Sequence, residues 1–389
     1  MSRLEFAACL ALFVTGVYAT SFGPALPILA HDFGVSLDAA GLLISVLFLA
    51  SITASAVVAI RLHSGEQRLL AATGLAAITA ACTLLALTAR WPLALVAVGL
   101  MGAGDGLMVA ATHTIAARSV DGVSRGINRL NIYFAVGAVA GPLWAGGVLA
   151  LDSGAREVVY LGIAALSFVV LGILWSGDEL PTPRSDSESV EPSLRAMDRL
   201  AWVIGLLLFL YVGAEFGLGS WVASYSSREF GAGIFTGALV TSGYWGALML
   251  GRLLSGRLFA LEVPPRRVLL WSIVAGLLSS SLIASANGIF AIAVGAAFAS
   301  GLAFGPIWPA AMSIAARDRG GNGPAAMVTI GNAGGFAFPW FQGRLLVSAG
   351  ASTGIAMTAV LCALMLVVLV ASRGLHPAPE VSENRLPIR

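Results

Sequence analysis

The sequence predicts an all-α membrane protein with twelve transmembrane helices in two six-helix pseudo-repeats. Three observations support this prediction. Of the 389 residues, 58% are hydrophobic and only 11% are charged, whereas a soluble domain carries roughly 25% charged residues. The mean hydropathy is +0.89. The apolar runs are about 20 residues long, which is the length a helix needs to cross a bilayer.

Twelve such runs follow one another along the chain. Their length indicates helices, because the strands of a membrane barrel alternate over about ten residues. The first run ends without a small-residue cleavage pattern, so we expect an uncleaved helix instead of a signal peptide. The predicted spans are 6–30, 39–60, 69–88, 92–117, 127–151, 158–175, 200–225, 233–259, 268–286, 289–316, 325–347 and 353–371.

Arginine placement predicts the orientation of these spans. All 22 basic residues are Arg, and basic residues collect on the cytoplasmic side of membrane proteins. With the N-terminus inside, thirteen arginines in loops and span ends are cytoplasmic and four are outside, namely Arg90, Arg156, Arg228 and Arg344. We therefore expect a multi-pass protein of an inner or plasma membrane with both termini in the cytoplasm.

A polar stretch rich in Ser, Pro, Asp and Glu divides the chain in the middle. We expect a six-helix bundle at 1–177, a cytoplasmic linker at 178–199, a second six-helix bundle at 200–372 and a cytoplasmic tail at 373–389. The end of span four, ATHTIAAR at 111–118, recurs as AAMSIAAR at 310–317 at the end of span ten. The matching position and span number indicate a duplicated unit.

These features together resemble the major facilitator superfamily over essentially the whole chain. Three stretches resemble its branch of fucose, galactose and glucose:proton symporters. They are LYVGAE at 210–215, GYWGALMLGRLLSG at 243–256 and NRLNIYFAVGAVAGP at 128–142. The resemblance implies alternating access and proton-coupled uptake of a sugar.

The chain departs from that branch at its polar positions. If Gly104-Asp-Gly106 occupies the place of the family's Gly-x-Gly, the family's carboxylate position falls on Val109 and its following Asn on His113. The family's sugar contacts in span five would fall on Asn131 and Phe134.

Asp105 and Glu215 are the carboxylates that lie well inside spans. A charged group at the bilayer centre costs about 2.5 to 3.5 kcal/mol on insertion scales, so such residues are usually functional. The chain has no Lys, and we expect no Arg at mid-span, because Arg252 and Arg344 lie toward the ends of theirs. Burial without a cation favours the neutral acid, which suits a proton carrier. His113 is a third proton-coupling candidate. Packing by hydrogen bonds to neighbouring helices is the alternative role for each.

Polar and aromatic side chains within the spans are the substrate-binding candidates. Aromatic rings can stack on a sugar or an apolar ligand, and amides can donate and accept hydrogen bonds. Core packing is the alternative role for the aromatic residues. The candidates are Asn128, Asn131, Phe134, Tyr211, Tyr244, Trp245, Trp308, Asn332 and Trp340.

The sequence therefore predicts a secondary transporter that couples a proton gradient to uptake of a small polar solute such as a sugar, with sodium as the alternative ion. A proton-driven exporter of an amphipathic or drug-like compound is the first alternative, and a non-transporting receptor or scaffold is the second. We expect no enzyme, because the spans hold no metal-ligand cluster, cofactor motif, nucleotide-binding loop or nucleophile set. We expect a monomer without a nucleic-acid partner, and Cys9, Cys82 and Cys362 as packing residues.

Overall fold

A computed structural model describes residues 1–61, 67–117, 119, 122–176, 199–315 and 323–372. The described residues of the first half form α1 (Arg3–Asp32), α2 (Leu37–Ala40), α3 (Leu42–Arg61), α4 (Gln67–Leu87), α5 (Trp91–Ala117), α6 (Val123–Leu151) and α7 (Arg156–Trp175). Those of the second half form α8 (Arg199–Phe230), α9 (Ile234–Ala260), α10 (Pro265–Ala284), α11 (Phe290–Phe304), α12 (Ile307–Ala315), α13 (Gly323–Ser348) and α14 (Ala351–Ala371).

These elements confirm the predicted all-helical membrane fold. Within the described residues, eleven segments are long and apolar enough to cross a membrane, with α2 and α3 counted as one segment and α11 and α12 as another. Among the described residues, α13 is the long helix that is not among these eleven segments. It has 26 residues, which is long enough to cross a membrane, and it contains the polar residues Asn332, Gln342 and Arg344. A polar spanning helix must face protein or an aqueous path instead of lipid. Consistent with this, α13 packs between α8, α3 and α14.

Span ten differs from its expected form as one continuous helix over 289–316. It is broken between α11 and α12 at Gly305 and Pro306. Proline lacks a backbone N–H donor and its ring clashes with the preceding turn, so one helix ends before this point and a new helix begins after it. By contrast, Pro142 and Pro339 lie inside the continuous helices α6 and α13. Span seven also differs, because α8 continues five residues past the expected end at residue 225.

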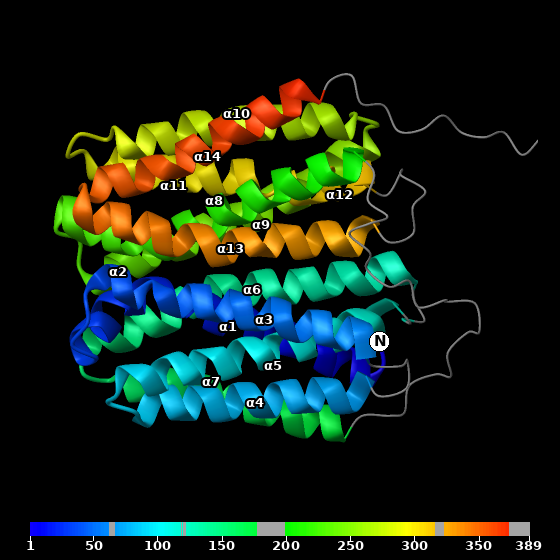
Figure 1. Ribbon diagram of the computed structural model, residues 1–389, viewed down its shortest axis with the longest axis vertical. Coiled ribbons are helices and arrows are strands. Elements are labelled where there is room, and N and C mark those ends of the chain that lie inside the picture. The colour runs from blue at the N-terminus through cyan, green and yellow to red at the C-terminus, as the bar shows by residue number, and fades with distance from the viewer. Residues whose placement is uncertain (62–66, 118, 120–121, 177–198, 316–322, 373–389) are drawn as a thin grey trace, which may run out of the picture.

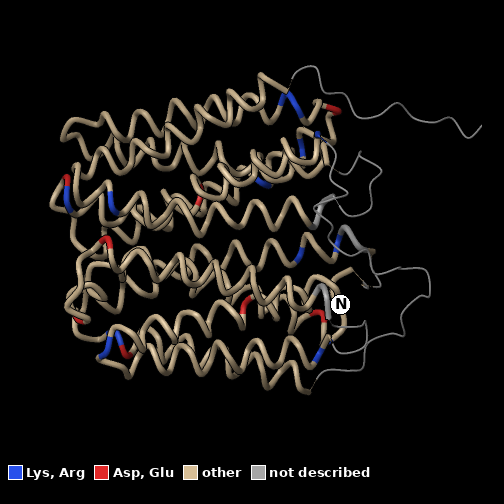
Figure 2. The backbone as a smooth tube through the Cα atoms, viewed as in Figure 1, with Lys and Arg blue, Asp and Glu red and all other residues tan. Residues whose placement is uncertain are grey.

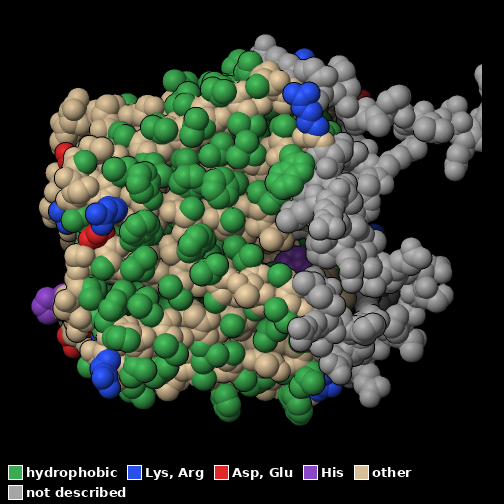
Figure 3. Space-filling model, viewed as in Figure 1, with side chains coloured by type: hydrophobic (Ala, Val, Ile, Leu, Met, Phe, Trp, Pro, Cys, Tyr) green, Lys and Arg blue, Asp and Glu red, His purple; other side chains and the backbone are tan. Residues whose placement is uncertain are grey.

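The helices run side by side in two groups, with α1–α7 in the lower half of Figure 1 and α8–α14 in the upper half. Hydrophobic side chains cover the flank of the molecule, as Figure 3 shows. Charged residues gather at the two ends of the bundle, with few between them (Figure 2). This distribution suits a belt of lipid around the middle and water at both ends. The linker at 178–199 and the tail at 373–389 lie outside the described residues, except for Arg199.

The two halves meet through α1, α3 and α6 of the first and α8, α9 and α13 of the second. Ser45 Oγ donates to the Phe336 carbonyl over 2.6 Å, and Ser242 Oγ donates to the Val139 carbonyl over 2.9 Å. At the bundle end opposite the N-terminus, an ion pair joins Arg344 Nη1 to Asp38 Oδ2 over 3.7 Å. These contacts lie between mid-bundle and that opposite end, which we name the far end.

Candidate functional site

Asp105 lies in α5 within the first half, where α1 and α3 supply it with hydroxyl donors. The Tyr18 hydroxyl donates to Oδ1, and Thr15 Oγ1 donates to the same atom over 3.4 Å. Ser51 Oγ donates to Oδ2 over 2.7 Å. Asp105 remains partly exposed. Within the described residues, no basic side chain lies within salt-bridge distance of it. The site can therefore hold either protonation state by hydrogen bonding, since hydroxyls both donate and accept.

Glycines bring α5 close enough to α3 for the hydrogen bond from Ser51 to Asp105. A Cβ on Gly102 would lie 2.2 Å from the Leu47 carbonyl oxygen, and one on Gly106 would lie 2.3 Å from that of Ser51. Both distances are impossible for a real side chain, so only glycine permits this approach. Small residues of this kind let helices in a bilayer pack at short distance, and Asp105 lies between the two glycines in sequence.

Glu215 has a different environment in the second half. Arg252 Nη2 donates to Glu215 Oε1 over 2.8 Å, and the side chains are 23% and 4% exposed, respectively. The expectation that no cation accompanies this acid is therefore wrong. The backbone of Arg252 lies toward one end of α9, but its long side chain reaches the Glu215 carboxylate on α8. Arginine side chains extend several ångströms from their backbone, so helix position alone does not fix where their charge lies.

Aromatic rings surround this ion pair. Tyr211 and Tyr244 are fully buried, and the Tyr244 hydroxyl donates to the Glu215 backbone carbonyl over 2.9 Å. Trp245 packs edge-on against Tyr244 at 5.3 Å between ring centroids. Trp308 is partly exposed and lies 6.4 Å from the Tyr211 ring. The three buried rings therefore pack within this cluster, and a substrate contact by any of them stays a prediction.

The other predicted site residues do not join either cluster. His113 is partly exposed, and its Nδ1 lies 2.9 Å from the Val109 carbonyl on its own helix instead of contacting Asp105. On α6, Asn128 and Asn131 are exposed, whereas Phe134 is partly buried. On α13, Asn332 and Trp340 are partly buried. Residue type therefore selected these side chains as candidates, but it did not predict which side chains lie next to them.

Sequence reasoning missed the three hydroxyl groups that surround Asp105. Tyr18 and Thr15 lie three residues apart on α1, and Ser51 lies on α3. The signal for the first pair was present, because residues at that spacing share a helix face. Their convergence on Asp105 depends on tertiary packing.

A further aromatic contact joins the two halves. Phe48 of α3 packs edge-on against Phe216 of α8, with 4.8 Å between the ring centroids.

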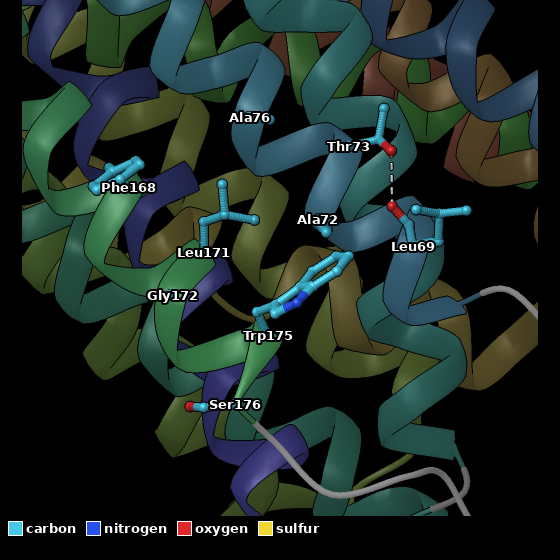
Figure 4. Close-up of a pocket in the computed structure, with 9 residues that line it drawn as sticks. All are labelled: Leu69, Ala72, Thr73, Ala76, Phe168, Leu171, Gly172, Trp175 and Ser176. Carbon is cyan, nitrogen blue, oxygen red and sulfur yellow. Dashed lines mark hydrogen bonds between the residues drawn. The ribbon is translucent and has the colours of Figure 1, made fainter.

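A groove on the flank of the first half is separate from both acids. It has a volume of about 610 Å³ and lies between α4 and α7. Figure 4 shows its lining, which includes Thr73, Phe168, Leu171 and Trp175. Phe168 and Trp175 are each more than half exposed on the apolar flank. The groove therefore opens on the apolar flank of the first half, away from the contacts between the two halves.

Solved transporters share this fold. A mutant of the nucleoside transporter NupG is similar at 14% identity and TM-score 0.76, over 95% of this chain and 98% of that one. D-xylose-proton symporter is similar at 12% identity and TM-score 0.77, over 94% and 96%. The transporter FucP in the outward conformation is similar at 18% identity and TM-score 0.67, over 94% and 98%. At these identities the likeness shows the fold alone.

The matching proteins also include a curated relative from Saccharomyces cerevisiae (strain ATCC 204508 / S288c), "Bypass of stop codon protein 6". It is 25% identical over 192 residues, which cover 45% of this chain and 37% of that protein. The match thus spans little more than a third of the relative's length. The family model described as Major Facilitator Superfamily matches residues 8–339. Together with the helical fold and its structural neighbours, this match shows that the chain belongs to the Major Facilitator Superfamily.

Proposed function

We propose that this protein is a proton-coupled secondary transporter in which Asp105 carries the proton, and that it takes up a small polar solute such as a sugar. The observation that carries the proposal is the environment of Asp105, a partly exposed carboxyl group held by three hydroxyl donors and no described cation. Protonation removes the charge penalty of burying this group while the carrier changes conformation.

Glu215 is the weaker proton carrier of the two acids. Its carboxylate is neutralised by Arg252 at 2.8 Å, and this favours a permanently charged pair. Taking up a proton there would leave the guanidinium buried without its partner, at a cost of several kcal/mol. We therefore assign Glu215 and Arg252 a supporting role in the second half, beside the substrate path.

Contacts between the halves support an inward-facing state of the carrier. The hydrogen bonds from Ser45 and Ser242 and the ion pair of Arg344 with Asp38 join the halves between mid-bundle and the far end. With both termini in the cytoplasm of an inner or plasma membrane, as the arginines predict, the far end is extracellular. The carrier is then in its inward-facing state, and transport as a monomer requires these contacts to separate in each cycle.

Proteoliposomes that contain a pH-sensitive dye test this function. A monosaccharide that enters with a proton should acidify the lumen, and Asp105→Asn should abolish this signal while preserving substrate exchange, because the amide resembles the protonated acid. The matched control is Asp152→Asn, an exposed residue beyond the end of α6. The control should transport normally. Gradient-driven accumulation by Asp105→Asn would contradict the proposal.

An exporter of amphipathic compounds is the second candidate. It is favoured by the apolar Val109 and Phe134, which stand at the positions where the symporter branch has polar groups, and both are partly buried. A response to amphipathic compounds with none to monosaccharides would assign the protein to this class. If dissipating the proton gradient has no effect with either class of compound, a uniporter, a sodium-coupled carrier or a protein without transport activity would be favoured.

A further inference from the structure

The groove between α4 and α7 has an apolar floor and a cation at one end. Small residues hollow it out, because Ala72, Ala76 and Gly172 occupy positions where larger side chains would fill the space. The Thr73 hydroxyl donates to the Leu69 carbonyl over 2.8 Å, and the Ser176 hydroxyl donates to the Ile173 carbonyl over 3.0 Å. These hydroxyls already bond to their own helices, so the groove walls offer a ligand mainly hydrocarbon contact.

Arg68 lies at the end of the groove where α4 begins and α7 ends. Its guanidinium carbon is 5.6 Å from the centroid of the Trp175 ring. Within the described residues, no carboxylate lies within salt-bridge distance of Arg68. Arg and Trp at the end of a spanning helix lie at the level of lipid headgroups. The guanidinium is therefore placed to receive a negatively charged group from the bilayer.

We propose that this groove binds one anionic phospholipid, with an acyl chain along α4 and α7 and the phosphate on Arg68. Charge complementarity selects the anionic lipid, because the cation lacks an acidic partner among the described residues while the rest of the lining is apolar. The stacked Trp175 ring holds the guanidinium over the mouth of the groove, which lowers the entropy lost on binding. The site lies on the lipid-facing flank, so it does not depend on the transported solute.

Native mass spectrometry of the full-length, delipidated protein tests this site. The probes are phosphatidylglycerol and phosphatidylcholine with identical acyl chains at equal concentration. We expect a preference of about fivefold for the anionic lipid in the first binding step, since one basic residue near an anionic headgroup contributes about 1 kcal/mol. Arg68→Gln should remove this preference. Arg90→Gln is the matched control, because this exposed arginine follows the opposite end of α4.

A second variant tests the apolar part of the site. A Cβ on Gly172 would meet no atom within 4 Å, so the side chain of Gly172→Leu has room to extend into the groove. It should weaken the binding of both lipids severalfold. Gly295→Leu on α11 is the matched control, because its added Cβ also enters open space. Equal binding of the two lipids by the parent, a preference that survives Arg68→Gln, or unchanged binding by Gly172→Leu would each overturn the proposal. So would a dimer that Gly172→Leu dissociates, because the groove would then hold a second copy.

Discussion

The two acids inside the membrane-spanning helices show how the same type of group takes different roles in different surroundings. Asp105 accepts hydrogen bonds from Tyr18, Thr15 and Ser51, which can also accept from it once it is protonated. Glu215 accepts from a guanidinium, which can only donate. The first environment tolerates a change in charge and the second resists it. This contrast is the reason for placing proton coupling at Asp105.

The ion pair of Glu215 and Arg252 yields a prediction about the stability of single-residue variants. Arg252→Gln leaves a carboxylate that is 4% exposed without its cation, and breaking a buried pair in this way costs about 3 to 5 kcal/mol. The variant should lower the thermal midpoint of the detergent-solubilised protein. Glu215→Gln together with Arg252→Gln should recover part of the loss, because no unpaired charge remains. A double variant less stable than Arg252→Gln alone would show that the charges themselves are needed.

Helix α5 is positioned by glycines on its two flanks. Gly102 and Gly106 face α3, whereas Gly104 faces α4, where its Cβ would lie 2.7 Å from the Gly74 carbonyl oxygen. In a bilayer, helices associate through such close contacts because hydrocarbon does not drive them together. The precise placement of Asp105 therefore depends on residues that have no side chain of their own.

A pair of alanine variants tests this seam. Gly106→Ala places a methyl group 2.3 Å from the Ser51 carbonyl oxygen, and such overpacking typically costs about 1 to 3 kcal/mol. It should lower the thermal midpoint and weaken proton-coupled transport by moving Ser51 away from Asp105. Gly99→Ala is the control on the same helix, because its methyl group would lie 3.6 Å from Val46 Cγ1, an ordinary contact. Equal midpoints in the two variants would argue against a tight seam.

At the scale of the whole molecule, the closed far end depends on close packing as well as on polar contacts. The Arg344 and Asp38 pair includes a side chain that is 61% exposed, and surface pairs of this kind contribute about 0 to 1 kcal/mol. The contact of α6 with α9 is tighter, since a Cβ on Gly146 would lie 2.1 Å from that of Ala238. Packing at this contact is therefore the stronger control of closure.

Substitution at that contact should change which side of the carrier is open. Gly146→Val forces α6 and α9 apart, so a cysteine introduced at the buried Ser45 should react severalfold faster with a membrane-impermeant thiol reagent added from the far side. The native cysteines, Cys9, Cys82 and Cys362, are buried and free, which keeps the background low. Gly147→Val is the control, because its nearest neighbour is Phe235 Cε2 at 4.0 Å. Equal labelling of the two variants would mean that this contact does not hold the far end closed.

The amino-acid sequence was enough to predict the class of protein, the positions of the spans and the two acids within them. Its apolar runs have helix length, and a bilayer admits only structures that satisfy their own backbone hydrogen bonds. Local composition therefore predicted the spans to within a few residues, apart from the break at Pro306 and the extension of α8. Asp105 and Glu215 stood out because charge inside an apolar run is costly.

The surroundings of those acids and the contacts between the halves depend on how the helices pack against one another. Ser51 reaches Asp105 because glycines let α5 approach α3, and Tyr18 reaches it from α1. Arg252 reaches Glu215 through a long side chain from the neighbouring helix α9. Such contacts join residues 37 to 87 positions apart. Helix periodicity gives the direction of a side chain around its own axis, whereas its partner depends on how the helices pack, which no local pattern encodes.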